Sequence, residues 1–346
     1  MTNAAVASPA AASATPPLCD RDTAPYSMTR ITSSDIDAQA ANLKQWKQVY
    51  EQMTPGHFVG SVHELCFSGV QVFRETTNQA VHESGAPWKG SRAIGVPMRV
   101  EGAALFRGQA IDTDALVTLG GDDELDFYTP CGFDILGLVV DECALEAHAR
   151  QIEHRDIATT FDGKGVLKPD PKRLDEFRRL LRSVLQSQDT NPAALGFRQT
   201  QRVLEQSLLR ALITVVADAD DRVSPKLPCP SRHQIVDAAK AYMRSHIDQP
   251  ITVADLCVEL GISRRTLQYS FQQVLGLNPV RFLRAMRLNG VRRDLKAATP
   301  PTGSVLDIAA RWGFWHAGHF VTDYKQMFSE LPSETLRRKG RPADAG

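Results

Sequence analysis

The chain has 346 residues, of which 42% are hydrophobic and 23% are charged. This composition is that of an ordinary globular protein with enough chain for two or three domains, and it excludes a fibre and a mostly unfolded polypeptide. The sequence contains no run of about 18 to 20 apolar residues, and its N-terminus lacks a basic start followed by an apolar stretch. We therefore expect a cytoplasmic protein without a membrane segment.

Cysteine and histidine spacing gives no sign of a metal site. The six cysteines are scattered without a Cys-x-x-Cys pair, and no His-x-His is present. These spacings predict neither a zinc site nor a disulfide framework. We expect reduced thiols, no bound metal and no cofactor.

Charge is distributed unevenly along the chain, although Lys and Arg equal Asp and Glu at 40 each. Residues 231–346 contain 17 basic and 10 acidic residues, which leaves 23 basic and 30 acidic residues in the rest. A basic C-terminal part suggests contact with a polyanion, most simply nucleic acid. The alternative is that the asymmetry serves only solubility.

The N-terminal part reads as a tail followed by a β-rich domain. Residues 1–26 are mostly Ala, Pro, Ser and Thr, which bury too little apolar surface to order the chain. A helical period covers residues 36–53. Short apolar stretches separated by turn residues then follow at 62–67, 70–73, 94–100, 115–119 and 133–140. This spacing is typical of a β-barrel or sandwich.

Two amphipathic helices are predicted next, over residues 174–185 and 204–215. One interpretation is that their apolar stripes pack on the β-structure. The other, compatible with the first, is that the second helix pairs with its copy in a homodimer. Clustered acids and three prolines then predict a linker at 218–231. The predicted division is a disordered tail at 1–26, a sensing and dimerisation domain at 27–217, the linker, a DNA-binding domain at 232–340 and a tail at 341–346.

An internal repeat marks the C-terminal part. In each copy a capping-box-like start, Thr252 to Asp255 or Ser304 to Asp307, opens a short helix that ends at Gly261 or Gly313. A second helix follows each glycine. The copies align at an offset of 52 residues over Asp255, Leu256, Leu260, Gly261 and Ile262, and at 53 over Leu267, Phe271 and Leu275. Helix, tight glycine turn and helix form a helix-turn-helix unit, which makes two unrelated helical hairpins the weaker alternative.

A third predicted helix, over residues 279–296, joins the copies. It would span about 25 Å at 1.5 Å per residue, enough to hold two such units apart. Major grooves on one side of B-DNA repeat at about 34 Å, so the pair could read successive grooves. Its basic residues, Arg281, Arg284, Arg287, Arg292, Arg293 and Lys296, either contact phosphates or form a solvated basic face.

Residues 233–338 resemble the DNA-binding domain of the AraC/XylS family of bacterial transcription regulators. The resemblance rests on the repeat, on the stretch Asp307-Ile308-Ala309-Ala310-Arg311-Trp312-Gly313-Phe314, and on Gly276-Leu277-Asn278-Pro279. It implies a sequence-specific binder of double-stranded DNA, usually an activator that contacts RNA polymerase.

Carried over by position, the resemblance implies a set of DNA-contacting residues. In the first reading helix these are Arg264, Arg265, Gln268 and Tyr269, whose Arg and Gln side chains can bond guanine and adenine bidentately. In the second helix they are His316, Gly318, His319 and Thr322, a set that departs from the family's usual polar residues. Arg293 on the connecting helix is the expected phosphate contact.

The N-terminal part is similar to regulators of the ethanolamine-operon type. The matching residues include Trp46, Tyr50 and the turn at 55–58. This similarity implies a sensor that holds a small-molecule effector, which the sequence does not identify. Arg74, Trp88, His57, His63 and His82 are candidates for binding it, and each is read more simply as a core or turn residue.

An enzyme is the competing class. The sequence has no Gly-x-Ser-x-Gly, phosphate-loop, dinucleotide-binding or His-Glu-x-x-His motif. We therefore predict a non-enzymatic α+β protein of two domains: a β-rich barrel or sandwich with helices, and an all-α domain of two helix-turn-helix units. Its predicted function is an effector-responsive activator of a catabolic or metabolic operon. The alternatives are a bifunctional protein with an enzymatic N-terminal domain and a dimerising regulator that needs no ligand.

Overall fold

The structure is a computed structural model of the whole chain. It describes residues 24–151, 157, 160–161, 165–190, 192–217, 232–247, 249, 251–298, 304–314 and 316–337. The predicted linker at 218–231 and the predicted tail at 341–346 lie outside the described residues, as do residues 1–23. The described chain opens with an ordered segment, since the first strand begins at Tyr26.

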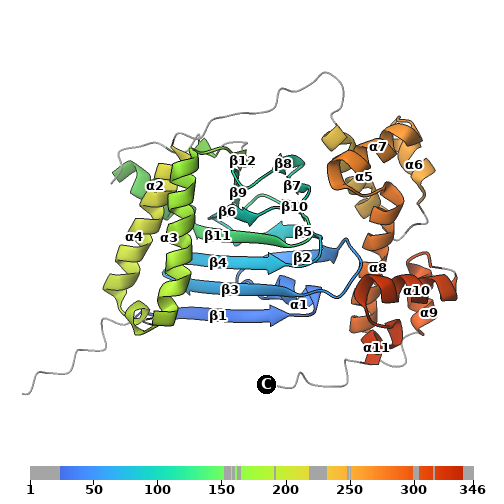
Figure 1. Cartoon of the computed structure of the whole chain (residues 1–346), viewed down its shortest axis with the longest axis horizontal. Coiled ribbons are helices and arrows are strands. Elements are labelled where there is room, and N and C mark those ends of the chain that lie inside the picture. Colours follow the sequence, from blue (N-terminus) through green and yellow to red (C-terminus); the bar gives the residue numbers. More distant parts are fainter. Residues whose placement is uncertain are drawn as a thin grey trace, which may run out of the picture.

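The N-terminal domain is a sandwich of two antiparallel sheets, one of the two forms predicted (Figure 1). The seven-stranded sheet has the order β1 (Tyr26–Ser33), β3 (Gly60–Phe67), β4 (Val70–Thr77), β11 (Phe133–Asp141), β6 (Ser91–Arg99), β9 (Leu116–Gly120) and β12 (Val166–Leu167). The five-stranded sheet has the order β2 (Lys47–Gln52), β5 (Val81–Ala86), β10 (Leu125–Thr129), β7 (Ala104–Phe106) and β8 (Gln109–Ile111).

Period-two alternation sorts the side chains of the large sheet between two apolar layers. Along β11, Ile135 and Val139 join the cluster between the sheets, whereas Leu136 and Leu138 join the cluster under the helices. That second cluster is covered by α2 (Glu142–Gln151), α3 (Pro171–Thr190) and α4 (Arg198–Val216). Figure 1 shows α3 and α4 side by side across this face. The stripes of the two predicted amphipathic helices therefore pack on the sheet.

The helical period at residues 36–53 is a wrong prediction for most of that range. Only α1 (Ile36–Ala41) is helical, and residues 47–52 form β2, which pairs with β5. Tyr50 is fully buried between the sheets. Glu51 and Gln52 are also buried, and both contact the helical domain, Glu51 through Arg293 and Gln52 through the Met327 carbonyl. The second half of this strand, residues 50–52, is buried on both faces, so it lacks the polar alternation that would distinguish it from a helix.

The C-terminal domain is all helical and confirms the predicted arrangement. It comprises α5 (Arg232–Ser245), α6 (Val253–Glu259), α7 (Arg264–Leu275), α8 (Pro279–Ala297), α9 (Val305–Arg311), α10 (Ala317–Phe328) and α11 (Pro332–Arg337). Helices α6 and α7 form the first helix-turn-helix unit, and α9 and α10 form the second. The 19-residue helix α8 connects them and packs its apolar residues against both units.

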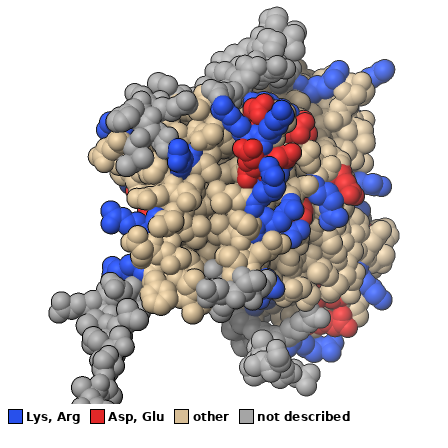
Figure 2. Space-filling view, turned by 60° about the vertical axis from the view of Figure 1, so that its left-hand side comes forward, with Lys and Arg blue, Asp and Glu red and all other residues tan. Residues whose placement is uncertain are grey.

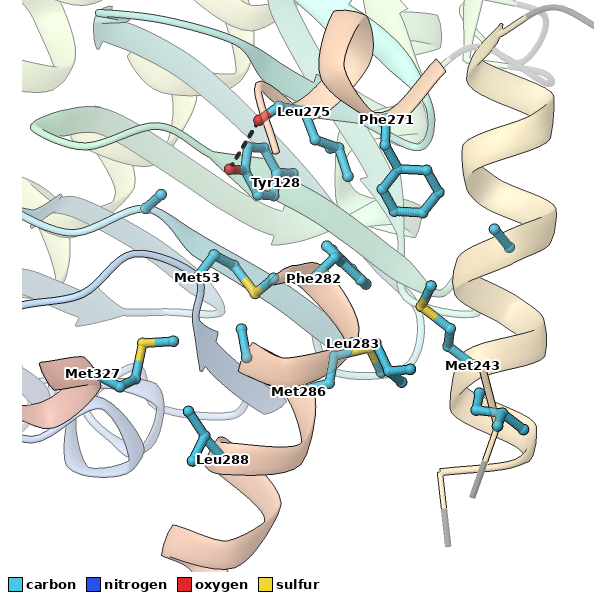
Figure 3. Close-up of a cluster of buried hydrophobic side chains, with 14 of the residues drawn as sticks. Met53, Tyr128, Met243, Phe271, Leu275, Phe282, Leu283, Met286, Leu288 and Met327 are labelled. Carbon is cyan, nitrogen blue, oxygen red and sulfur yellow. Dashed lines mark hydrogen bonds between the residues drawn. The ribbon is translucent and has the colours of Figure 1, made fainter. Parts of the chain in front are cut away.

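The helical domain covers the five-stranded sheet on the side away from the sandwich interior. Apolar side chains of both domains form one buried cluster, in which Tyr128 donates a hydrogen bond to the Leu275 carbonyl over 3.3 Å (Figure 3). The sheet contributes Met53, Ala80, Leu105 and Tyr128, and the helices contribute Phe271, Leu275, Phe282, Met286 and Met327 among others. We call this contact the interdomain seam.

Charged and polar groups surround the apolar part of the seam. Asn289 of α8 pairs with the backbone of Gln52 through two hydrogen bonds of 3.0 and 2.9 Å, as a neighbouring strand would. The ion pairs join Arg292 to Asp35, Arg293 to Glu51, Lys240 to Asp126, and Lys296 to Asp35 and Asp37. Burial would raise the pKa of Asp35, but the charges of Arg292 and Lys296 lower it below its usual range. The acidic N-terminal domain thus binds part of the basic C-terminal domain.

Glu75 is a buried acid in the sandwich interior, and it makes stability depend on pH. Burial raises the pKa of Glu75 to about 7, although hydrogen bonds from Gln39 and Tyr50 favour its charged form. A raised pKa in the folded state means that stability is greatest when the acid is protonated and falls as pH rises through about 7.

We predict that the melting temperature of the wild-type protein falls relative to that of Glu75→Gln as pH is raised from 5 to 8. The glutamine carries no titrating charge and therefore removes this source of pH dependence. Thermal unfolding followed by circular dichroism measures both proteins. A temperature difference that stays constant over this range would contradict the assignment.

Candidate nucleic-acid interface

The two helix-turn-helix units begin with the capping boxes predicted from the sequence. In the first, Thr252 N–H donates to Asp255 Oδ2 over 2.7 Å and Asp255 N–H donates back to Thr252 Oγ1 over 3.4 Å. In the second, the corresponding distances between Ser304 and Asp307 are 2.9 and 3.1 Å. Each box pairs N–H groups that the first helical turn leaves without a partner, which sets the start of α6 and α9.

The turns between the helices depend on glycine. Gly261 and Gly313 have φ values of 62° and 81°, a region that residues with a Cβ atom rarely adopt. The residue after each glycine then bonds back to the first helix, Ile262 to the Cys257 carbonyl and Phe314 to the Ala309 carbonyl, both over 3.0 Å. The same geometry recurs in both copies because the same residues recur.

Helix α7 presents the first predicted set of DNA contacts to solvent. Arg264, Arg265, Gln268 and Tyr269 are all exposed, whereas Leu267 and Phe271 are fully buried. The Tyr269 ring lies 4.8 Å from the guanidinium of Arg232 in α5, and its hydroxyl accepts a hydrogen bond from Gln273 over 2.9 Å. These contacts hold the ring in place, so α7 offers an oriented polar surface.

Helix α10 presents the second set. His316, Gly318, His319 and Thr322 are exposed, and the two histidine rings stack with centroids 4.6 Å apart. The Thr322 hydroxyl donates to the Gly318 carbonyl over 2.9 Å. The helix starts at His316 without a side-chain cap, in contrast to α7, where Ser263 Oγ accepts from Thr266 N–H. Helix α10 therefore has a less stabilised N-terminus than α7.

A groove of about 840 Å³ lies between the two units. Arg264 from the start of α7 and both His316 and His319 from the start of α10 line it, together with Arg284 and Arg287 of α8. The structure thereby brings together predicted contacts that lie more than 50 residues apart in the sequence.

The two α8 arginines in this groove have partners within the protein. Arg284 forms an ion pair with Asp323, and Arg287 donates to the carbonyls of Gln249 and Ile251 over 3.0 and 3.2 Å. Burial lowers the pKa of Arg287. Arg287 thus attaches the segment before α6 to α8, and Arg284 attaches α10 to α8. The spacing of residues along α8 did not predict this structural role.

Arg293 lies away from the groove, in the interdomain seam. Its guanidinium is 3.4 Å from Glu51 Oε1, and the neighbouring Arg292 is buried against Asp35 and Glu330. The structure therefore does not place Arg293 with the exposed residues of α7 and α10. Sequence spacing could not separate these basic residues because the seam forms only when the second domain docks.

Charge elsewhere on the surface is mixed. On the side of the molecule that Figure 2 brings forward, Lys and Arg lie beside Asp and Glu, and broad areas carry no charge. DNA-binding faces are typically continuous in positive charge.

No helix in the described part of the chain is both long and apolar enough to cross a bilayer.

Comparison with known proteins agrees with this geometry. Residues 256–338 match a family model described as a helix-turn-helix domain. A probable thc operon regulatory protein of Rhodococcus erythropolis is 39% identical over 153 residues, which are 44% of this chain and 46% of that protein. XylDLEGF operon transcriptional activator 3 of Pseudomonas putida is 32% identical over 111 residues, 32% of each chain. The C-terminal domain is an AraC/XylS-type helix-turn-helix domain.

One solved structure is also similar to part of this chain. The crystal structure of a probable AraC family transcriptional regulator from Rhodopseudomonas palustris CGA009 is 38% identical and covers 31% of this chain and 98% of its own, with a TM-score of 0.29. This chain spans less than half the length of the two curated relatives. The family match and the two curated relatives confirm, for the C-terminal domain, the resemblance stated from the sequence.

Glycines on α8 and α10 provide a test of how the second unit of the AraC-type domain is held. A Cβ atom on Gly290 would lie 2.3 Å from the ring of Trp312, whose indole N–H donates to Asp294 over 2.9 Å. A Cβ atom on Gly318 meets nothing within 4 Å.

We predict that Gly290→Ala destabilises the protein by about 1 to 3 kcal/mol through overpacking. Gly318→Ala should instead stabilise it by about 0.5 to 1 kcal/mol, because alanine favours the helix. Chemical denaturation measures both changes. If both substitutions change the free energy of unfolding equally, the contact between the Trp312 ring and Gly290 is not needed for stability.

Proposed function

We propose that the protein is a sequence-specific, double-stranded-DNA-binding regulator of transcription that acts in the cytoplasm. The observation that carries this proposal is the pair of exposed polar helices, α7 and α10, which open onto one groove and are held by one rigid helix, α8. Two reading helices on a common support can enter successive major grooves on one side of the duplex.

Each predicted contact has a role in this proposal. Arg264, Arg265 and Gln268 read base edges, because their side chains can form bidentate hydrogen bonds with guanine or adenine. Tyr269, His316, Gly318, His319 and Thr322 contact the backbone or base edges of the same site. The exposed side chains of α7 exceed those of α10 in hydrogen-bonding capacity, so the first unit contributes more specificity.

Further parts of the proposal concern partners. The relatives include proteins named as an operon regulatory protein and an operon transcriptional activator, which supports an activator of transcription. Such an activator would work beside RNA polymerase. A homodimer would place two copies on DNA, and a small-molecule effector would act through the N-terminal sandwich. An enzymatic role has no catalytic motif in its favour.

The base-reading role of α7 can be tested with Arg265→Ala. The substitution should weaken binding to the specific site about 10- to 100-fold, because a bidentate arginine–guanine pair is worth about 1 to 3 kcal/mol. Binding to random DNA should change much less. Electrophoretic mobility shift with a salt series measures both affinities.

Arg182→Ala is the matched control, since it removes an exposed arginine from α3 on the far side of the sandwich. Equal loss of specific binding in both variants would reject base reading by Arg265.

The phosphate role of Arg293 is tested against its seam partner. A phosphate contact by Arg293 requires its ion pair with Glu51 to open when DNA binds. Arg293→Ala should then weaken binding to all DNA sequences alike and reduce the slope of the salt dependence by about one. Glu51→Gln breaks the same ion pair but keeps the arginine charge, so it should not weaken binding. If both substitutions have the same effect, Arg293 acts in the seam and not on DNA.

A further inference from the structure

A chamber lies between the two sheets, on the face of the five-stranded sheet opposite the interdomain seam. It has a volume of about 50 Å³, enough for a group of about three or four heavy atoms. Its walls include the aromatic residues Trp46, Phe73, Phe106 and Phe127 and the polar residues Gln48, Tyr50, Glu75 and Glu83. Trp46 and Gln48 are half-exposed, so they mark the side that opens to solvent.

Two carboxyl groups from different sheets meet in this chamber. Glu75 comes from β4 of the large sheet, and Glu83 comes from β5 of the small sheet, directly opposite Tyr50 in the register of β2 and β5. Burial raises the pKa of both acids, and the charge of Glu75 raises that of Glu83 further. The two acids therefore disfavour each other's ionisation.

The chamber is short of hydrogen-bond donors for these acids. Glu75 accepts from Gln39 Nε2 over 2.8 Å and from the Tyr50 hydroxyl over 3.0 Å. Glu83 is more than nine-tenths buried, and its polar neighbours are Tyr50 and Thr129. Both hydroxyls hydrogen-bond to Glu83, but each has one proton and a second acceptor, Glu75 for Tyr50 and the Val81 carbonyl for Thr129. Glu83 thus shares both of its donors with other acceptors.

We propose that this chamber binds the head group of a small organic cation, an amidinium, guanidinium or primary ammonium, between Glu75 and Glu83. Such a group supplies several N–H donors and a positive charge, the two things that the pair of acids lacks. The surrounding aromatic faces attract a cation further. A longer substituent would leave past Trp46 and Gln48. This inference rests on the proposed function only in identifying the cation as the effector of the regulator.

The strands that line the chamber also form the interdomain seam. Successive residues of a strand point to opposite faces. Tyr50 and Glu83 face the chamber, while their neighbours Glu51 and His82 face the helical domain. There, Glu51 lies 3.4 Å from Arg293, and His82 lies within hydrogen-bond distance of Arg244. A shift of β2 or β5 on binding therefore moves groups that hold the DNA-binding domain.

The same alternation occurs on β10, the third strand of this sheet. Phe127 lines the chamber, whereas Asp126 pairs with Lys240 over 2.8 Å and Tyr128 bonds to Leu275. The five-stranded sheet alone thus separates the proposed ligand from the helical domain that contains α7.

The test compares three probes of nearly identical shape: acetamidinium, acetamide and acetate. Isothermal titration and thermal-shift measurements on the full-length protein, at matched ionic strength without DNA, should show saturable binding of acetamidinium. The neutral and anionic probes should bind at least about tenfold more weakly, because charge-assisted hydrogen bonds contribute about 1.5 to 3 kcal/mol. Equal binding of acetamide, or no saturable binding of acetamidinium, would overturn the proposal.

Variants locate the site. Glu83→Gln and Glu75→Gln should each weaken acetamidinium binding about tenfold or more. Glu64→Gln is the matched control, because Glu64 is a fully buried acid of the same domain that accepts from Lys44 N–H and Gln71 and does not line the chamber. It should leave the affinity within about twofold. Equal losses in all three variants would overturn the placement, and the wild-type probe series stands even where one variant fails to fold.

The outcome for DNA binding is measured separately by mobility shift. A protein that binds specific DNA but not acetamidinium keeps the proposed function and loses this inference. A protein that binds acetamidinium but no specific DNA keeps this inference and loses the proposed function. Altered affinity for specific DNA in saturating acetamidinium, abolished by Glu83→Gln, would support the cation as the effector.

Discussion

The five-stranded sheet is the element on which the arrangement of this protein depends, because both of its faces are buried against different partners. One face closes the sandwich interior, and the other carries the apolar and ionic groups of the interdomain seam. A strand can serve two partners in this way only because its side chains alternate in direction. Removing the helical domain would expose Met53, Leu105 and Tyr128 together with several acids.

Helix α8 is the counterpart of that sheet on the other side of the seam. It supports both helix-turn-helix units through Arg284, Arg287 and the close approach of Trp312 to Gly290. Its last turns carry Arg292 and Lys296, which pair with acids of the N-terminal domain. The spacing of α7 and α10 and the position of the sandwich are therefore set by the same 19 residues.

Charge has two uses in this molecule. The sequence asymmetry between an acidic first part and a basic second part indicated a nucleic-acid partner. The structure shows that several of those charges neutralise each other across the seam, so the net basic character of the C-terminal part overstates what DNA would meet. Arg264 and Arg265, which are exposed on α7, lie outside the seam.

The sequence by itself determined the features that depend on neighbouring residues. Capping boxes at Thr252 and Ser304, positive φ at Gly261 and Gly313, and apolar spacing on α8 are local. The repeat showed the capping boxes and the glycines twice. Only the tertiary structure decided that residues 47–52 are a strand, that Arg293 faces Glu51, and that Glu75 and Glu83 share a chamber. These outcomes depend on partners far away in sequence, because burial on two faces removes the polar alternation of a strand and domain docking selects which charges are paired.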